Sequence, residues 1–313
     1  MEKIKVSVVI ASYNGADYIE EQLESIRKQT LPPDELIICD DRSNDDTVGV
    51  VEKYIKKHKL DDKWSITINE KNLGYADNFD RVTMRATGSL IFFSDQDDVW
   101  NLDKIETMTG IMKEHPECVV LCTDYQPWYT SENAPKAPKS IIDRMPNNGL
   151  LETVKFKKKS VYIGALGCCM CVRKEFYHSI SQYRFIGWAQ DDRMWKMAQC
   201  VHGCIILHKN LVKHRIHDNN TSTYGKYHTV ERRVKLFSQM LEAEQQMLKY
   251  LTDNNATSYE IKLMRKHISM IKKRLCLVRD KKLLNIIPLI GYLPYYERIK
   301  SYMVELYISL KGK

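Results

Sequence analysis

Several features that would place this chain in a familiar class are missing. The first residues, MEKIKVSVVIASYN, pass directly into a strand pattern without the charged and then apolar segment of an export signal. No uninterrupted apolar run reaches the length of about 18 residues that a membrane-spanning helix needs. Nine cysteines lie at irregular spacings, which is typical of reduced thiols and not of a disulfide framework. We therefore expect a cytoplasmic protein.

Glycine is scarce where two classes of nucleotide-binding enzyme would need it. The turn after the first expected strand, in VSVVIASYNG, contains only Gly15, whereas a dinucleotide-binding oxidoreductase needs G-x-G-x-x-G there. The glycine-rich, basic phosphate loop of enzymes that synthesise sugar nucleotides is also missing near the N-terminus. The first class is disfavoured, and the second stays as an alternative.

Charge is unevenly distributed along the chain. Residues 226–313 contain 18 of the 48 Lys and Arg but 8 of the 40 Asp and Glu, so they carry +10 while the remaining residues carry −2. Such asymmetry indicates an anionic partner for the C-terminal part, either an anionic membrane surface or nucleic acid. Because basic and aromatic residues form no recognisable nucleic-acid module, a nucleic-acid-binding protein is the weaker alternative.

Short apolar runs alternate with segments of helical spacing in the first part of the chain. In ADYIEEQLESIRKQ, for example, Ile19, Leu23 and Ile26 fall on one helix face. This alternation predicts an α/β fold with an open, mostly parallel sheet flanked by helices. Residues 126–149 contain four of the nine prolines and indicate a long loop. The expected strands are residues 6–10, 36–39, 65–68, 90–93 and 119–122.

Acidic residues crowd the end of one expected strand. In LIFFSDQDDVW (90–100), Asp95, Asp97 and Asp98 follow a buried run directly, where their charges repel one another. Either they lie in solvent and cap the next helix, or a cation lies between them. Alternate carboxylates can hold a divalent cation through one or two oxygens and leave its other positions to phosphates.

Polar turns after two other strands would meet this acidic cluster, because ligands bind where parallel strands end and the strand order reverses. They are SYN (12–14) and DDRS (40–43). Tyr13 would lie against a nucleobase, and Asp41 would accept a hydrogen bond from the imide N–H of that base. The alternative interpretation is that Asp40 and Asp41 only cap a turn.

Together these motifs resemble the inverting family 2 glycosyltransferases of GT-A fold, most closely the bacterial rhamnosyltransferase-like branch that builds surface polysaccharides. The resemblance rests on VSVVIASYNGADYIEEQLESIRKQTLPPDELIICDDRSNDDT followed by FFSDQDDVW, and it covers roughly residues 4–225. It implies a GT-A type nucleotide-diphospho-sugar transferase domain over residues 1–225. It also implies a UDP- or dTDP-linked sugar donor, a glycan or lipid-linked glycan acceptor, and a divalent cation, Mg or Mn.

The resemblance implies roles for individual residues as well. Asp97 would be the direct metal ligand, with Asp95 or Asp98 nearby. The segments NLGYADNF (72–79) and HRIHDNNTS (214–222) match the family too, and the second would bring Arg215 and His217 to the diphosphate or the cation. The residues expected to bind the nucleotide sugar are Ala11, Tyr13, Asn14, Asp41, Asn72, Gly74, Asn78, Asp95, Arg215 and His217.

The segment FIGWAQDDRMWKMA resembles the place where this branch carries its catalytic carboxylate. A base is required because the acceptor hydroxyl must lose its proton as it attacks the anomeric carbon. The family often shows His-Asp there, whereas this chain has Gln190-Asp191. Asp191 is therefore the expected general base, with Asp192 as the alternative; one of the two aspartates would otherwise only cap the following helix.

Residues 226–313 form a basic, helical C-terminal region. Residues 229–251 and 257–279 have the spacing of two amphipathic helices, and LLNIIPLIGYLPYY (283–296) is an apolar stretch broken by Pro288 and Pro294. This stretch suits a membrane interface with its tyrosines at headgroup depth, or it packs against the catalytic part or a second subunit. We therefore expect a metal-dependent hexosyl- or rhamnosyltransferase, peripheral at the inner face of the cell membrane.

Overall fold

The N-terminal part alternates strands and helices, as the sequence predicts. The computed structural model describes residues 4–132, 134–217 and 229–311. The strands that end in Ser12, Asp40 and Ser94 are buried apolar runs, which is typical of strands covered on both faces. The elements are β1 (Val6–Ser12), α1 (Ile19–Arg27), β2 (Glu35–Asp40), α2 (Thr47–His58), β3 (Trp64–Ile68), α3 (Tyr75–Met84), β4 (Leu90–Ser94), β5 (Val99–Trp100) and α4 (Lys104–Glu114).

The second part of the sheet is less regular than the first. Strand β6 runs ten residues, to Tyr129, so the expected loop over 126–149 begins later and also contains the short helix α5. This extension exists because residues 126–129 pair with the end of β9. The elements are β6 (Val120–Tyr129), α5 (Lys139–Ile142), β7 (Leu151–Thr153), η1 (Gly167–Cys169), β8 (Met170–Arg173), α6 (Lys174–Ser179), η2 (Ser181–Tyr183), α7 (Gln190–Cys200) and β9 (Cys204–Ile216).

The described strands form one sheet with the order β3-β2-β1-β4-β8-β6-β9-β5, and β7 pairs with β9. The first four strands are parallel, whereas β8 is antiparallel to both of its neighbours, β4 and β6. The sheet is therefore mixed beyond β4. Because β1 lies between β2 and β4, the strand order reverses at β1. The loops that follow β1 and β4 therefore begin beside each other, at the same edge of the sheet.

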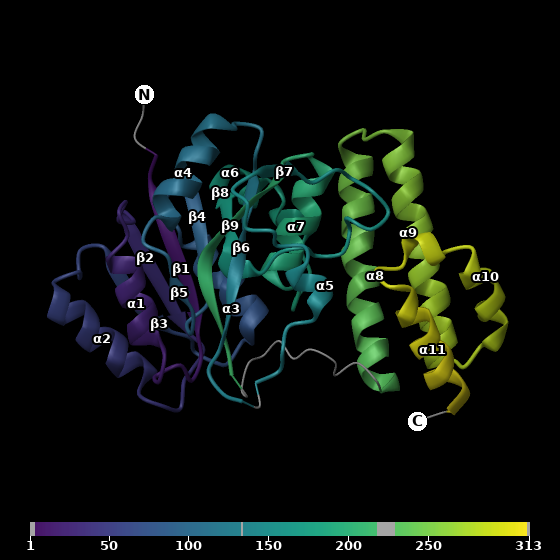
Figure 1. Cartoon of the computed structure of the whole chain (residues 1–313), viewed down its shortest axis with the longest axis horizontal. Coiled ribbons are helices and arrows are strands. Elements are labelled where there is room, and N and C mark those ends of the chain that lie inside the picture. Colours follow the sequence, from purple (N-terminus) through teal and green to yellow (C-terminus); the bar gives the residue numbers. More distant parts are fainter. Residues whose placement is uncertain (1–3, 133, 218–228, 312–313) are drawn as a thin grey trace.

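Both faces of the sheet are covered, as Figure 1 shows. Val8 and Ile10 of β1 point to one face and share a core with α1, α2 and α4, including Ile19, Leu23 and Ile26 of α1. Val9 points to the other face and belongs to a core that includes α3 and α7. The alternation of side chains along a strand therefore places consecutive residues of β1 in two separate cores.

The C-terminal region is helical, and its first two helices match their expected ranges closely. Helices α8 and α9 stand side by side next to α7, and α10 and α11 lie outermost (Figure 1). Phe237 and Met247 of α8 belong to the same core as α7, so the region is packed onto the N-terminal part. The elements are α8 (Val230–Asp253), α9 (Ser258–Arg279), η3 (Leu283–Asn285), α10 (Ile286–Ile290), η4 (Leu293–Tyr295) and α11 (Ile299–Lys311).

The stretch 283–296 divides into an inner and an outer part. Leu289, Tyr295 and Tyr296 are buried, whereas Leu284 and Ile287 are exposed. The expectation that the tyrosines lie at headgroup depth is therefore wrong for Tyr295 and Tyr296, because both pack inside the helical region. None of the described helices combines the length and the apolar character that crossing a bilayer requires.

Candidate active site

A cleft of about 550 Å³ opens where β1, β2 and β4 end. It gathers most of the residues that the sequence indicated, from five separate segments of the chain. Asn14, Asp98, Asp192, Arg215 and His217 lie outside its lining. The predicted residues that line it are Ala11, Tyr13, Asp41, Asn72, Gly74, Asn78, Asp95, Asp97 and Asp191.

One end of the cleft is organised around the buried carboxylate of Asp41. This carboxylate accepts hydrogen bonds from the backbone N–H groups of Leu73 and Gly74, each at 2.8 Å, and from Asn69 Nδ2 at 2.8 Å. Gly74 has a φ of +79°, a conformation that favours glycine. Because each carboxylate oxygen has two lone pairs, Asp41 can still accept a bond from a ligand.

The neighbouring amides hold this turn in place. Asn72 Nδ2 donates to the backbone oxygen of Asp41 at 3.0 Å, and Asn78 Nδ2 donates to that of Cys39 at 2.8 Å. Asn14 serves a different turn, because its Oδ1 accepts from the backbone N–H of Asn44 at 2.7 Å. Tyr13 is 45% exposed, so its ring presents a face on which a planar ligand can stack.

Gln96, which separates Asp95 from Asp97, fixes the backbone of Tyr13. Its Oε1 accepts from the Tyr13 N–H at 2.9 Å, and its Nε2 donates to the Tyr13 carbonyl at 3.0 Å. A Cβ atom on Gly15 would lie 2.4 Å from Gln96 Oε1, so glycine is needed for this close approach. The sequence interpretation passed over Gln96 as a spacer, although it lies in the middle of the acidic motif.

Each aspartate of SDQDD has a different environment. Asp95 faces the cleft, and Asp97 Oδ2 lies 3.0 Å from His217 Nε2. Asp98 is buried, and its Oδ1 accepts from His214 Nδ1 at 2.9 Å and from the Arg215 N–H at 3.0 Å.

The guanidinium of Arg215 connects the acidic motif to the first helix. Its Nε donates to the Asp97 carbonyl at 2.7 Å, and it also forms an ion pair with Glu21 of α1. His214, which lines the cleft, was not among the predicted residues, although it precedes Arg215 in the matching segment. Arg215 and His217 thus contact the acidic motif from outside the cleft lining.

The electrostatics of this cluster favour a bound cation. Burial, together with the charges of Asp98 and Asp97, raises the pKa of Asp95 to about 8. Burial opposes the charged form of His214, but the Asp98 carboxylate outweighs it and raises the pKa of His214 to about 9. Asp98 Oδ2 is buried and has no hydrogen-bond partner within the described residues.

Among the described residues, Asp95, Asp98, Cys168 and His214 can bring ligand atoms within 4.8 Å of one another. Carboxylate oxygens are suitable ligands for Mg or Mn, whereas imidazole nitrogens and thiols favour softer metals. Asp97 is not a member of this group; it lies beside it, against His217. The two carboxylates of this group, Asp95 and Asp98, therefore fit a hard divalent cation, with Asp97 at their edge.

The two neighbouring aspartates at the start of α7 have separate roles in the structure. Asp191 lines the cleft, and burial together with the charge of Asp192 raises the pKa of Asp191 to about 6. Asp192 accepts a hydrogen bond from Trp188 Nε1 at 2.8 Å and forms an ion pair with Lys196, which is 5% exposed. Asp191 is thus the carboxylate that a substrate in the cleft would meet.

Comparison with known protein families gives a match over more than half of the chain. The family model described as "Glycosyl transferase family 2" matches residues 7–181. The putative teichuronic acid biosynthesis glycosyltransferase TuaG of Bacillus subtilis is 37% identical over 120 residues, which are 38% of this chain and 46% of TuaG. The poly(ribitol-phosphate) beta-N-acetylglucosaminyltransferase TarS of Staphylococcus aureus is 34% identical over 121 residues, 38% of this chain and 20% of TarS. The chain thus matches less than half of the length of each of these two curated relatives.

Solved structures share the fold over nearly the whole chain. The crystal structure of S. aureus TarS 1-349 in complex with UDP superposes with a TM-score of 0.61 at 19% identity, covering 99% of this chain and 92% of that one. The mannosyltransferase PcManGT from Pyrobaculum calidifontis, in complex with GDP-Man and Mn2+, gives a TM-score of 0.59 at 15% identity, covering 100% and 88%. The predicted GT-A type fold with a C-terminal helical region is therefore confirmed.

Proposed function

The chain belongs to glycosyl transferase family 2, and from this membership we propose that it is an inverting glycosyltransferase. It moves a sugar from a UDP- or dTDP-linked donor to a lipid-linked or growing surface polysaccharide. The observation that carries the proposal is that one cleft is lined by Tyr13 and Asp41, by Asp95 and Asp97 of the acidic motif, and by Asp191. The first pair would bind the nucleotide, the acidic motif would serve the leaving diphosphate, and Asp191 would activate the acceptor.

The nucleotide lies at the Asp41 end of the cleft. Tyr13 stacks on the base, and Asp41 accepts a hydrogen bond from the imide N–H of uracil or thymine. Asn72 and Gly74 hold Asp41 in place directly, and Asn78 does so through Asn69, whose Nδ2 donates to both Asn78 and Asp41. Ala11 and Asn14 belong to the turn that carries Tyr13.

The diphosphate lies over the acidic motif. Asp97, with Asp95 or Asp98 nearby, would hold Mg or Mn, and the ion would supply positive charge to the leaving diphosphate. Arg215 and His217 contact Asp97, and the Arg215 guanidinium adds positive charge on the same side.

Asp191 is the general base. The acceptor hydroxyl oxygen forms a bond to the anomeric carbon, the bond from that carbon to the diphosphate oxygen breaks, and the hydroxyl proton passes to Asp191. A carboxylate with a pKa raised to about 6 is still ionised at neutral pH and is a stronger base than an ordinary aspartate. Asp192 is engaged by Trp188 and Lys196, which supports Asp191 as the base.

Several finer assignments belong to the same proposal. The transferred sugar is a hexose or rhamnose, as in the rhamnosyltransferase-like branch. Catalysis is assigned to residues 1–225, and attachment to the inner face of the cell membrane is assigned to residues 226–313. The boundary between the two regions falls outside the described residues.

The proposal is tested with a panel of UDP-, dTDP- and GDP-sugars, with Mg or Mn and with excess chelator. We expect metal-dependent release of free nucleoside diphosphate from one donor. Release of pyrophosphate instead would favour the alternative enzyme of sugar-nucleotide synthesis. Salt-sensitive binding of oligonucleotides without any donor turnover would favour a nucleic-acid-binding protein.

A further inference from the structure

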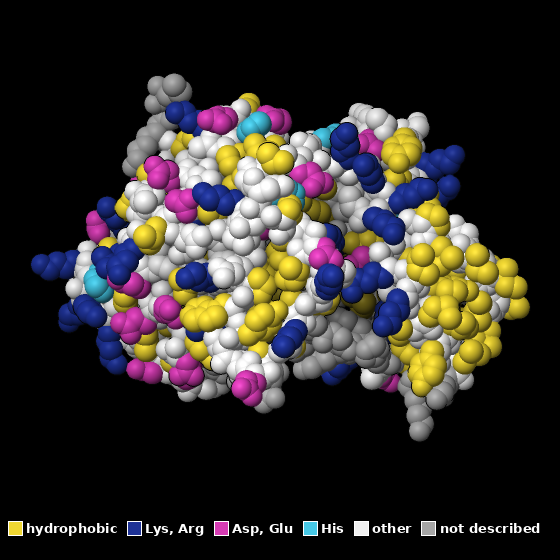
Figure 2. Space-filling model, in the orientation of Figure 1, with side chains coloured by type: hydrophobic (Ala, Val, Ile, Leu, Met, Phe, Trp, Pro, Cys, Tyr) yellow, Lys and Arg dark blue, Asp and Glu magenta, His cyan; other side chains and the backbone are white. Residues whose placement is uncertain are grey.

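The outer side of the C-terminal region carries a large exposed apolar surface. Figure 2 shows hydrophobic side chains gathered over α10 and α11, at the end of the molecule farthest from α2. Leu284 is 92% exposed and Ile287 is 76% exposed, values unusual for side chains of this size. This surface, the outer apolar face, consists of Leu283, Leu284, Ile287, Ile290, Ile299, Met303 and Leu310.

Buried charges hold the helices beneath this face in place. The Arg274 guanidinium of α9 donates to both carboxylate oxygens of Glu305 in α11, at 2.6 and 3.1 Å. Tyr296 Oη donates to the same carboxylate at 3.2 Å. Glu305 and Tyr296 are fully buried and Arg274 nearly so, so α11 is fixed onto α9 by contacts that solvent does not reach. The outer apolar face is thus the surface of a packed unit.

A stripe of positive charge runs beside the apolar face. Five side chains of α9 that are exposed or half-exposed, at positions spread over residues 262–273, are basic. These residues, the basic stripe, are Lys262, Arg265, Lys266, Lys272 and Lys273. The stripe meets the start of α10 at a hollow of about 420 Å³, which Arg265, Lys272, Lys273 and Asn285 help to line.

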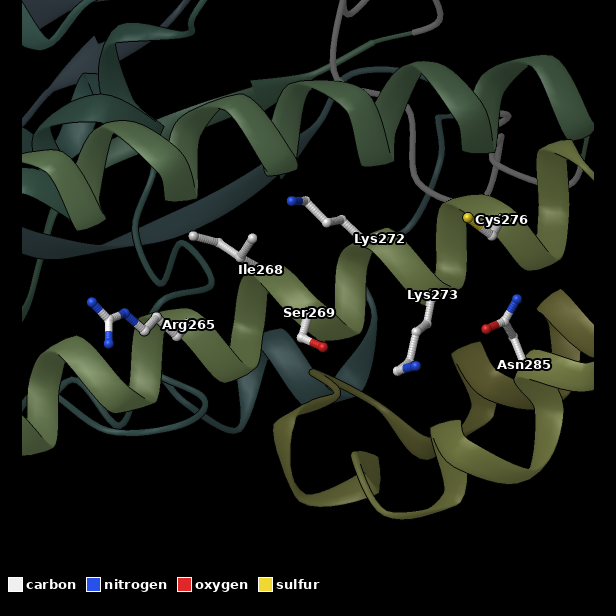
Figure 3. Close-up of a pocket in the computed structure, with 7 residues that line it drawn as sticks. All are labelled: Arg265, Ile268, Ser269, Lys272, Lys273, Cys276 and Asn285. Atoms are coloured by element: carbon white, nitrogen blue, oxygen red, sulfur yellow. The ribbon is translucent and has the colours of Figure 1, made fainter.

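The basic side chains at this hollow do not converge on one point. Lys272 and Lys273 point to opposite sides of α9, and Arg265 points away from both (Figure 3). A pocket for a single phosphate would aim its donors at one place. Cations spread along a helix instead suit a surface that carries many separate negative charges.

The acidic residues in the described part of 280–311 pair with other cations and not with the basic stripe. Residues 280–311 contain three, Asp280, Glu297 and Glu305. Asp280 pairs with Arg279, Glu297 pairs with Arg298, and Glu305 is buried against Arg274.

We propose that the outer apolar face and the basic stripe together form one membrane-docking surface, whose partner is the headgroup region of an anionic lipid bilayer. This inference rests on the proposed function, and it names the surface that performs the attachment. The apolar side chains enter the interface while the basic stripe lies at headgroup level, as in interfacial amphipathic helices. A second copy of the chain fits less well, because a symmetric contact would bring two basic stripes close to each other.

The first test replaces exposed apolar side chains of the outer apolar face. Leu284→Ser/Ile287→Ser is compared with Leu102→Ser/Leu150→Ser, which alters two exposed leucines of the catalytic part. Binding is measured by co-sedimentation with two kinds of vesicle. Neutral vesicles contain phosphatidylcholine alone, and anionic vesicles contain equal parts of phosphatidylcholine and phosphatidylglycerol. We expect the Leu284/Ile287 variant to lose about tenfold or more in partitioning to the anionic vesicles, because less apolar surface leaves water. The control variant should bind like the wild type.

The second test removes charge. Lys272→Gln/Lys273→Gln is compared with Lys56→Gln/Lys57→Gln, the same change near the end of α2. We expect the α9 variant to lose about tenfold or more in binding to anionic vesicles and the α2 variant to lose much less, because only charges near the surface contribute. Wild-type binding should also weaken with added salt without disappearing.

Several results would overturn the inference. One is that both apolar variants bind vesicles as the wild type does. Another is that the Leu284/Ile287 variant converts a dimer to a monomer in sedimentation velocity, with vesicle binding unchanged. Saturable binding of glycerol 3-phosphate or an oligonucleotide, without vesicle binding, would also refute it. Release of nucleoside diphosphate, measured without vesicles, should be the same in all variants, so a failure of the enzymatic proposal is detected separately.

Discussion

Asp191→Asn should abolish sugar transfer and at the same time stabilise the protein at alkaline pH. Burial and the charge of Asp192 raise the pKa of Asp191 to about 6 in the folded protein. The pKa of an aspartate in the unfolded chain is about 3.9, so folding raises it by about two pKa units. When Asp191 is ionised, this difference lowers the free energy of unfolding by about 3 kcal/mol. The folded state binds more protons than the unfolded state between these two values, so the free energy of unfolding falls as pH rises through about 6. The cost is fully present at pH values near 8 and absent below about 4.

Two assays follow from this reasoning. Chemical denaturation in chelator should show Asp191→Asn to be more stable than the wild type by about 3 kcal/mol near pH 8, with little difference near pH 4. Transfer should fall by about a hundredfold or more, whereas the Kd for the nucleoside diphosphate stays unchanged, because a base acts on the acceptor. The wild-type kcat/KM should rise with pH up to about 6 and then level off, as the base loses its proton.

The neighbouring aspartate provides the matched control. Asp192→Asn should keep transfer but lower the stability of the protein, because it leaves the buried Lys196 without its ionic partner. If Asp192→Asn loses transfer while Asp191→Asn retains it, the assignment of the base is wrong. If the stability difference between Asp191→Asn and the wild type does not change with pH, the explanation by a raised pKa of the buried Asp191 carboxylate is wrong.

Three further perturbations test the rest of the site and the C-terminal region. Asp97→Ala should abolish metal-dependent donor turnover, and undiminished activity of this variant in excess chelator would disprove a role in metal binding. Gln96→Ala should weaken binding of the nucleoside diphosphate by about tenfold in calorimetry, because it removes both hydrogen bonds that hold the Tyr13 backbone. An unchanged Kd would show that Tyr13 keeps its position without Gln96. Glu305→Gln should lower the free energy of unfolding by about 3 kcal/mol or more in urea, because it leaves the buried Arg274 charge uncompensated. A loss under about 1 kcal/mol would mean that this ion pair is solvated.

The fold of the N-terminal part could be predicted because its signals are local. A parallel strand covered on both faces is a short continuous apolar run, so the sequence pattern predicts strands at residues 6–10, 36–39 and 90–93. Helix α9 is equally local, since Thr257 and Glu260 form a reciprocal capping box at its start. The mixed half of the sheet has no such signal. Its strand β8, for example, is only four residues long and is placed by its pairing with β4 and β6.

The candidate site divides in the same way. The amino-acid order alone determined which residue types end each strand, and the family motifs drew attention to Tyr13, Asp41, Asp97 and Asp191. Only the tertiary structure shows that Asp191 lines the cleft. Asp192 does not line it, and its contacts with Trp188 and Lys196 are local, each four positions away.

Tertiary structure also decided the contacts that no local pattern contains. Gln96 meets Tyr13 across 83 positions of sequence, and His214 meets Asp98 across 116. Residue spacing predicts which side of a strand or helix a side chain occupies, but it carries no information about which distant strand lies beside it. The apolar stretch 283–296 shows the same limit: hydropathy found it, and packing alone decided that Tyr296 is buried while Leu284 remains exposed.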